Sequence, residues 1–253
     1  MSIQINKPAL WHTMIPRPDE KTHKYSRGMA VIYAAPEMTG ASRLAATACA
    51  RMGAGLVTVL CAPEIKTVYQ CTLPAHIIVR DDLKYSDERI SARLYGSGGL
   101  STDLPASYDI PTVLDADALA HLPETLSDQT FLTPHEGEFA KAFPNITGSR
   151  EEKALKGAEK TGATCVLKGA HTYIAAPDGR CVKSNQASPY LATAGSGDVL
   201  AGMITGLLAQ HMPAYEAACA AVWIHGECAR RHGIGLVASD LSNIIPTVLN
   251  EIT

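Results

Sequence analysis

The short sequence GSGD, which ends at Asp198, places two glycines and a carboxylate directly before an apolar run. Gly195 and Gly197 can adopt positive φ angles and let a ligand approach the backbone closely. The helix predicted over 199–210 offers free N–H groups and the positive end of its dipole, which suit a phosphate. Asp198 fits beside phosphate if it acts as a base toward a hydroxyl group that is being phosphorylated. A simple helix N-cap at Ser196 or Asp198 explains the motif about as well.

Three further titratable side chains follow apolar runs of the sequence. Lys168 comes after the residues CVL, and a lysine at the end of a buried strand is costly unless paired, so a charged ligand is a reasonable partner. The alternative is a lysine that extends its ammonium group to solvent. His135 lies in the acidic sequence TPHEGEF, where a surface turn competes with a binding role. Glu138 lies where a helix is expected to begin, so it can simply stabilise the helix dipole.

Two other patterns have simpler explanations. The glycine cluster YGSGG at 95–99 needs no function beyond a turn. His225, Cys228 and His232 have helical spacing that would suit metal ligands, but the same stripe includes alanines and no C-x-x-C pair completes a zinc site. We therefore expect core packing there. The chain also lacks a Walker A motif and a G-x-G-x-x-G that opens a helix after the first strand, which disfavours P-loop and Rossmann sites.

The elements that must position these residues alternate between strand-like and helix-like runs. Strands are predicted at 29–34, 55–62, 112–119 and 163–169, and a hairpin is predicted over 172–184 with its turn at 177–179. Helices are predicted at 42–54, 199–210, 214–232 and about 239–251. One more helix is predicted to begin at the Ser149–Glu152 capping box and to end at about residue 161. Near-continuous apolar strands separated by helices predict a three-layer α/β/α fold with a mainly parallel central sheet. Ligands of such sheets bind beyond the carboxyl ends of the strands, where the polar clusters lie. Gly202 and Gly206 within the apolar helix indicate close helix packing.

The composition narrows the class of protein. The chain has 253 residues, 46% of them hydrophobic, and no linker-like tract or repeat, so we expect a single domain over residues 1–253. The net charge of −3 gives no electrostatic case for a nucleic-acid partner or a membrane surface, and no run is long enough to span a bilayer. Seven scattered cysteines and the absence of a secretory signal favour the cytoplasm.

Several motifs in this order resemble one known family. The sequences are MTGASRLAATACARMGAGLVTV, GSGG, VLDADAL, LTPHEGEFAKAF, VLKGAHTYIAAPDG, GSGDVLAGMITGLLAQ and GLVASDL. Together they are similar to the NAD(P)H-hydrate dehydratase family, a branch of the ribokinase-like fold, from about His23 to the C-terminus. The resemblance implies dehydration of the S epimer of hydrated NADH or NADPH with ADP or, less commonly, ATP. The implied chemistry is phosphorylation of the C6 hydroxyl followed by loss of phosphate, which repairs the cofactor.

The resemblance also implies roles for individual residues. Ala41, Gly98 and His135 would line the site for the hydrated cofactor, with Asp198 as the base at the substrate hydroxyl. The nucleotide would be held by a larger set, namely Lys168, Gly169, Ala170, His171, Thr172, Gly195, Ser196 and Gly197. A magnesium ion is expected between the phosphates, where Glu138 or Asp115 could position it through water. The resemblance further suggests a homotetramer. Many relatives carry a fused N-terminal epimerase domain, for which we expect no room in this chain of 253 residues.

Two departures from the family pattern concern the substrate side of the pocket. Ala34 and Ala35 stand where the family usually has a glycine pair, and Ser97 stands in the middle of its usual GPG. Alanine allows a less close approach to the backbone than glycine. Two alternatives remain open: a vitamin-precursor alcohol kinase of the hydroxymethylpyrimidine or hydroxyethylthiazole type, or a nucleotide-binding protein whose catalysis has decayed.

Overall fold

The computed structural model describes residues 3–123 and 125–252. The strands of this part of the chain are β1 (Gln4–Ile5), β2 (Met29–Tyr33), β3 (Leu56–Leu60), β4 (Ile78–Arg80), β5 (Ile90–Tyr95), β6 (Thr112–Leu114), β7 (Thr130–Leu132), β8 (Thr164–Leu167), β9 (Thr172–Ala175) and β10 (Cys181–Ser184). The α-helices are α1 (Thr39–Arg51), α2 (Lys66–Thr72), α3 (Glu136–Ala142), α4 (Arg150–Thr161), α5 (Ser196–Ala209), α6 (Ala214–His232) and α7 (Ala238–Ile252). Short 3₁₀ helices are η1 (Pro8–Leu10), η2 (His12–Met14), η3 (Pro63–Ile65), η4 (Ala116–Ala120) and η5 (Pro189–Leu191).

These strands form one sheet in the order β1-β10-β9-β8-β7-β6-β5-β2-β3-β4. The strands from β8 through β7, β6, β5, β2 and β3 to β4 run parallel. Only β9 pairs antiparallel with its neighbours β8 and β10, because a tight hairpin joins β9 to β10. The predicted hairpin over 172–184 is therefore confirmed, and so is the mainly parallel sheet.

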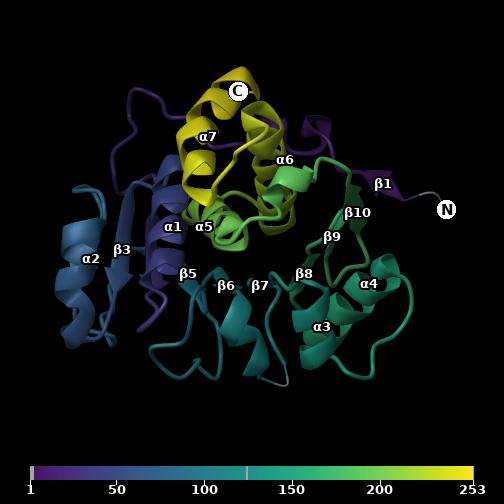
Figure 1. Cartoon of the computed structure of the whole chain (residues 1–253), viewed down its shortest axis with the longest axis horizontal. Helices are drawn as coiled ribbons and strands as arrows, with labels where there is room; N and C mark the ends of the chain where they lie inside the picture. Colours follow the sequence, from purple (N-terminus) through teal and green to yellow (C-terminus); the bar gives the residue numbers. More distant parts are fainter. Residues whose placement is uncertain (1–2, 124, 253) are drawn as a thin grey trace.

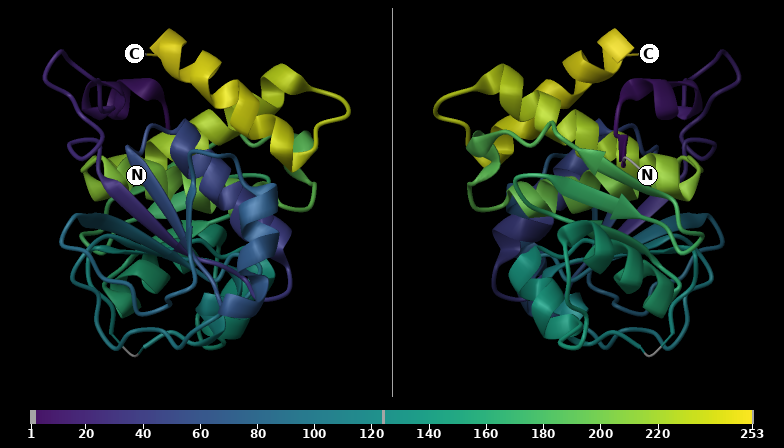
Figure 2. Two further views of the ribbon diagram at one scale, coloured as in Figure 1. Left: turned by 90° about the vertical axis from the view of Figure 1, so that its left-hand side faces the viewer. Right: turned by 90° about the vertical axis from the view of Figure 1, so that its right-hand side faces the viewer.

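Helices cover both faces of the sheet, as the alternation of side chains along β2 requires. Ala30 and Ile32 belong to a core formed with α1, α5, α6 and α7, whereas Met29, Val31 and Tyr33 face the core beneath α3 and α4. Figure 1 shows α1, α5, α6 and α7 on one side of the sheet and α3 and α4 on the other, and Figure 2 shows the two layers from the sides. The predicted three-layer α/β/α fold is confirmed.

The contact between α1 and α5 depends on glycine. A Cβ atom added at Gly202 would lie 2.1 Å from the carbonyl oxygen of Ala45, and one at Gly206 would lie 2.5 Å from that of Cys49. Any side chain at these positions would force the helices apart. The predicted packing role of both glycines is confirmed.

Several local expectations need correction. The strand predicted over 112–119 ends at Leu114 and continues as η4, and the helix predicted from residue 42 begins at Thr39. The Ser149–Glu152 capping box is present, since Ser149 N donates to the Glu152 carboxylate at 2.7 Å and Glu152 N donates to Ser149 Oγ at 3.2 Å. Among the described residues, no helix combines the length and apolarity that a bilayer-spanning segment needs.

Candidate active site

The carboxyl ends of five neighbouring parallel strands bring the polar clusters to one edge of the sheet. Ala35 follows β2, Ser97 follows β5, Asp115 follows β6, His135 follows β7 and Lys168 follows β8. Adjacent parallel strands end at the same edge, so these segments lie side by side. The N-terminus of α5, which bears Asp198, arrives at the same edge. The sheet therefore gathers residues that are up to 163 positions apart, from Ala35 to Asp198.

Asp115 is the most deeply buried carboxylate of this edge, with 2% of its side chain exposed. Its Oδ1 accepts hydrogen bonds from Thr133 Oγ1 at 2.7 Å and from Lys168 Nζ at 3.0 Å, and its Oδ2 accepts one from Ser97 Oγ at 3.2 Å. Three donors offset the cost of removing the charge from water. The serine at position 97 thus supplies a donor that the proline of the family pattern could not supply.

Lys168 is paired inside the protein and does not extend to solvent. Its side chain is 18% exposed, and its Nζ lies 3.0 Å from Asp115 Oδ1 and 3.9 Å from Glu138 Oε2. Burial alone would lower the pKa of the ammonium group, but the carboxylates of Asp115 and Glu138 outweigh burial and hold the pKa above its usual value. The lysine therefore stays charged at neutral pH and can attract an anionic ligand as well.

Asp198 is the third residue of α5 and does not cap that helix. The N-cap residue is Gly195, at φ +89°, and no side chain makes a capping hydrogen bond at this end of the helix. Ser196 Oγ donates instead to the carbonyl oxygen of Leu191 at 2.7 Å. The N-cap interpretations of Ser196 and Asp198 are both wrong, because a left-handed glycine already turns the chain into the helix.

The electrostatics of Asp198 follow from its surroundings. Burial raises the pKa of this partly buried carboxyl to about 6, and the neighbouring carboxylate of Asp115 acts in the same direction. Ser97 and Lys168 oppose the rise without cancelling it. A carboxyl group with this pKa is ionised at neutral pH and still basic enough to accept a proton.

Gly197 has ordinary helical geometry, so of the two glycines in the motif it is Gly195 that uses the positive φ open to glycine. Its importance is steric, because a Cβ atom there would lie 3.2 Å from Lys168 Nζ. The glycine therefore leaves room for the ammonium group to lie against the first turn of α5. Backbone N–H groups and a cation meet at this place, which suits the phosphate groups of a ligand.

The opposite side of the edge has small side chains in close contact. Gly98 has φ +81°, and a Cβ atom there would lie 2.6 Å from Met38 O, 2.7 Å from Ala41 Cβ and 3.1 Å from Ala35 Cβ. Gly98 and Ala41, predicted to line one site, are thus neighbours. Ala34 and Ala35 are fully buried, and Ala35 N donates a hydrogen bond to Ser42 Oγ at 2.7 Å.

His135 caps α3, so it is neither an ordinary surface turn nor a side chain held by burial. Its Nδ1 accepts hydrogen bonds from Gly137 N at 3.0 Å and Glu138 N at 3.2 Å, while Glu138 Oε2 accepts one from His135 N at 2.7 Å. The exposed fraction of the His135 side chain is 61%. The capping box fixes the ring through Nδ1, and Nε2 lies 3.5 Å from Glu138 Oε1.

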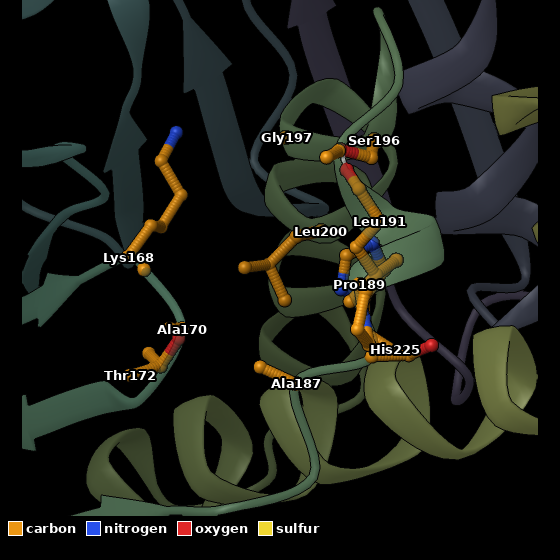
Figure 3. Close-up of a pocket in the computed structure, with 13 residues that line it drawn as sticks. Lys168, Ala170, Thr172, Ala187, Pro189, Leu191, Ser196, Gly197, Leu200 and His225 are labelled. Atoms are coloured by element: carbon orange, nitrogen blue, oxygen red, sulfur yellow. Dashed lines mark hydrogen bonds between the residues drawn. The ribbon is translucent and has the colours of Figure 1, made fainter.

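A cavity of about 470 Å³ opens beside Lys168 and α5 (Figure 3). Its walls include Lys168, Gly169, Ala170, Thr172, Ser196 and Gly197. Six of the eight residues predicted to hold the nucleotide therefore surround one cavity. His171 and Gly195 do not line it, since His171 is exposed and Gly195 packs against Leu44 and Ala238.

Sequence reasoning missed the other half of this cavity. The loop between β10 and α5 contributes Ala187, Ser188, Pro189, Leu191 and Ala192, α5 contributes Leu200, and α6 contributes His225. The predicted core packing of His225 and Cys228 is confirmed, since both are buried, and His225 in addition lines this cavity. His232 of the rejected metal stripe is partly exposed and lies 3.5 Å from Asp240 Oδ2.

A metal ion at this site would depend mainly on ligands from outside the chain. Asp115 already accepts three hydrogen bonds, and Glu138 accepts one from His135 N. Within the described residues, no group of three or more histidine, cysteine, aspartate or glutamate side chains could hold a metal. This donor set fits magnesium, which keeps several waters and is held by one or two carboxylates together with phosphate oxygens.

Comparison with known proteins identifies one family. The family model for NAD(P)H-hydrate dehydratase matches residues 29–247. The bifunctional NAD(P)H-hydrate repair enzyme Nnr of Moorella thermoacetica is 37% identical, and the match covers 96% of this chain and 53% of that protein. The ADP-dependent (S)-NAD(P)H-hydrate dehydratase of Neisseria meningitidis serogroup B is 34% identical, with 92% of this chain and 89% of that protein covered. The chain thus spans about half the length of its bifunctional relatives and nearly all of the monofunctional one.

A solved structure shares the whole fold. The ADP/ATP-dependent NAD(P)H-hydrate dehydratase from Bacillus subtilis, co-crystallized with ATP and Mg²⁺, superimposes with a TM-score of 0.86. The two sequences are 29% identical, and the match covers all of both chains.

Proposed function

The chain belongs to the NAD(P)H-hydrate dehydratase family, and we propose that it uses ADP or ATP to dehydrate the S epimer of hydrated NADH or NADPH. The observation that best supports this proposal is Asp198, a carboxyl group with a raised pKa next to the buried Asp115–Lys168 pair and close to a nucleotide-sized cavity. A base, a cation and a helix N-terminus at one point suit transfer of a phosphoryl group to a hydroxyl.

The proposed reaction has two steps, and Asp198 acts in the first. The C6 hydroxyl oxygen of the hydrated nicotinamide attacks the terminal phosphorus of ADP, the bond from phosphorus to the bridging oxygen breaks, and AMP leaves. Asp198 accepts the hydroxyl proton as the new bond forms. In the second step phosphate departs with the C6 oxygen while C5 loses a proton, which leaves the C5–C6 double bond of NADH or NADPH.

The other residues of the site bind and orient the two substrates. Lys168 and the N–H groups at the start of α5 hold the nucleotide phosphates, and Asp115 keeps Lys168 in place through its 3.0 Å bond. Ala41, Gly98 and His135 line the side that receives the nicotinamide. Magnesium bound to the phosphates, with Glu138 or Asp115 reaching it through water, would neutralise charge that develops during transfer.

The decisive assay follows recovery of NADH from its S hydrate by absorbance, with Mg²⁺ and either ADP or ATP. We expect NADH to form only when nucleotide is present, together with one AMP for each NADH when ADP is used. Turnover of a vitamin-precursor alcohol, with none of the hydrate, would instead identify a kinase. Failure with both nucleotides would exclude the dehydratase assignment.

The pKa of Asp198 predicts an acid limb in the pH profile. The protonated carboxyl cannot act as a base, so kcat/KM should rise with pH up to about 6 and level off above it. Asp115→Asn removes a neighbouring negative charge and should lower the pKa of Asp198, which moves the limb to lower pH. A limb that stays in place in Asp115→Asn would show that another group titrates.

A further inference from the structure

Ser97 is a buried polar residue in the glycine turn that follows β5. Its exposed fraction is 1%, and its hydroxyl group donates a hydrogen bond to Asp115 Oδ2 at 3.2 Å. Gly96 and Gly98 on either side of it have φ angles of +99° and +81°, which glycine adopts without strain. A Cβ atom at Gly96 would lie 1.9 Å from the carbonyl oxygen of Asp115. The turn therefore lies directly against the residue that the serine binds.

A second buried hydroxyl group holds the other side of this turn. Ser42 Oγ, on α1, donates to the carbonyl oxygen of Ser97 at 3.1 Å and accepts a hydrogen bond from Ala35 N at 2.7 Å. Tyr69, on α2, donates its hydroxyl group to the carbonyl oxygen of Ala35 at 2.7 Å. Ser42, Ala35 and Tyr69 are fully buried, so water does not compete for these bonds. Two positions that depart from the family pattern, Ala35 and Ser97, thus belong to one hydrogen-bonded unit.

This unit ends on the carboxylate that holds Lys168. Asp115 Oδ1 accepts hydrogen bonds from Thr133 at 2.7 Å and from Lys168 at 3.0 Å, whereas Oδ2 accepts one from Ser97 and from no other described residue. Donors on both oxygens fix the rotation of the carboxylate about its Cβ–Cγ bond, which is otherwise a broad torsion. The direction of Oδ1 in turn fixes the Lys168 ammonium group, which lies against the first turn of α5 at Gly197.

We infer that Ser97 is a positioning residue for nucleotide binding: its hydroxyl group fixes the Asp115 carboxylate and, through it, the Lys168 ammonium group that receives the phosphates. Ser42 acts one step further away, because it holds the carbonyl group of Ser97 and hence the turn. The inference rests on the proposed function in so far as Lys168 binds the phosphates of ADP. A proline at position 97 has no side-chain donor, so this chain orients its lysine with a bond that the GPG sequence cannot make.

Calorimetric titration with ADP tests this role without turnover. Ser97→Ala should weaken ADP binding about fivefold to tenfold, because Asp115 loses the donor that fixes its rotation. Ser97→Thr keeps a hydroxyl group and should restore most of the affinity. Ser97 also lowers the pKa of Asp198, so the titrations are run at about pH 8, where that carboxyl group is ionised in each variant.

A double-mutant cycle shows whether the serine acts through the lysine. The Lys168→Met background has no ammonium group, so Ser97→Ala should have no further effect on ADP affinity there. Ser42→Ala should weaken ADP binding by a smaller factor and should add little to Ser97→Ala, since both act on the same turn. A purely structural loss would instead weaken binding by the same factor in both backgrounds.

Ser91→Ala is the matched control, because Ser91 belongs to β5 as well and lies near its other end. Its partly buried hydroxyl group donates to Ala209 O at 2.8 Å and accepts a hydrogen bond from Met29 N at 3.0 Å. The exchange therefore also removes internal hydrogen bonds. Urea unfolding should show a loss of stability in Ser91→Ala, while its ADP affinity stays at the wild-type level.

The outcomes separate this inference from the dehydratase assignment. Unchanged ADP affinity in Ser97→Ala, or an equal loss in the Lys168→Met background, would overturn the positioning role. So would a Ser97→Thr variant that is as stable as the wild type and yet binds ADP as weakly as Ser97→Ala. An effect of Ser97 on ADP binding without NADH recovery by the wild type would contradict the proposed function alone. NADH recovery with unchanged ADP affinity in Ser97→Ala would contradict this inference alone.

Discussion

Replacing Asp198 by asparagine should lower kcat for dehydration by about 10²- to 10⁴-fold, the usual contribution of a general base. Asparagine keeps the size and position of the side chain but cannot accept the hydroxyl proton. Affinity for ADP should be unchanged or slightly higher, because a negative charge close to the nucleotide phosphates has been removed. Steady-state turnover of the S hydrate and calorimetric binding of ADP measure the two effects independently.

Asp128→Asn is the matched control, because Asp128 is an exposed aspartate in the turn before β7, away from the cavity. It makes the same chemical change, and turnover should stay at the wild-type level. Near-normal turnover in Asp198→Asn would refute the base role and leave Asp198 with only an electrostatic effect on the first turn of α5.

Replacing Lys168 by methionine should lower both stability and nucleotide affinity. The Asp115 carboxylate, 2% exposed, would lose its only cationic hydrogen-bond partner among the described residues. Removing one partner of a buried pair costs about 3 kcal/mol or more. Affinity for ADP should fall about tenfold to a hundredfold through the loss of a charge-assisted bond to phosphate. Urea unfolding and calorimetric titration measure the two losses.

The double variant Lys168→Met with Asp115→Asn separates these two effects. A neutral amide no longer needs a cation, so most of the lost unfolding free energy should return, while ADP binding stays weak. If stability and ADP affinity recovered together, the phosphates would not depend on Lys168. If neither recovered, the loss would come from the packing of the lysine side chain and not from its charge.

The sequence allowed the prediction of those elements whose pattern is strong and local. The hairpin of β9 and β10 has alternating residues and a Pro-Asp-Gly turn, and α5 and α6 are long apolar helices. In contrast, β1 has two residues, β4 is a short edge strand, and α2 has seven residues without a side-chain cap. Tertiary pairing alone stabilises such segments, so no local pattern distinguishes them from loops.

The candidate site shows the same division between local and long-range information. The GSGD and KGAHT motifs can be recognised in the sequence as candidate binding segments, and the structure brings Asp198 and Lys168 together as neighbours. Ser97 and Thr133 have common polar side chains in unremarkable contexts, and only the parallel order of β5, β6 and β7 reveals that both bind Asp115. His225 belongs to a helix whose apolar pattern hides its contact with the cavity.

The close packing of α1 against α5 also bears on the order of folding. The two helices are separated by more than 140 residues, from Arg51 to Ser196, and closing a loop of that length costs entropy before any contact is gained. Lys168 and Asp115 can occupy their strand ends once the sheet has formed, but Asp198 reaches them only when Gly202 and Gly206 have seated α5 on α1. A nascent chain whose synthesis has not yet reached residue 198 could therefore form the Asp115–Lys168 pair at the strand ends but would lack Asp198.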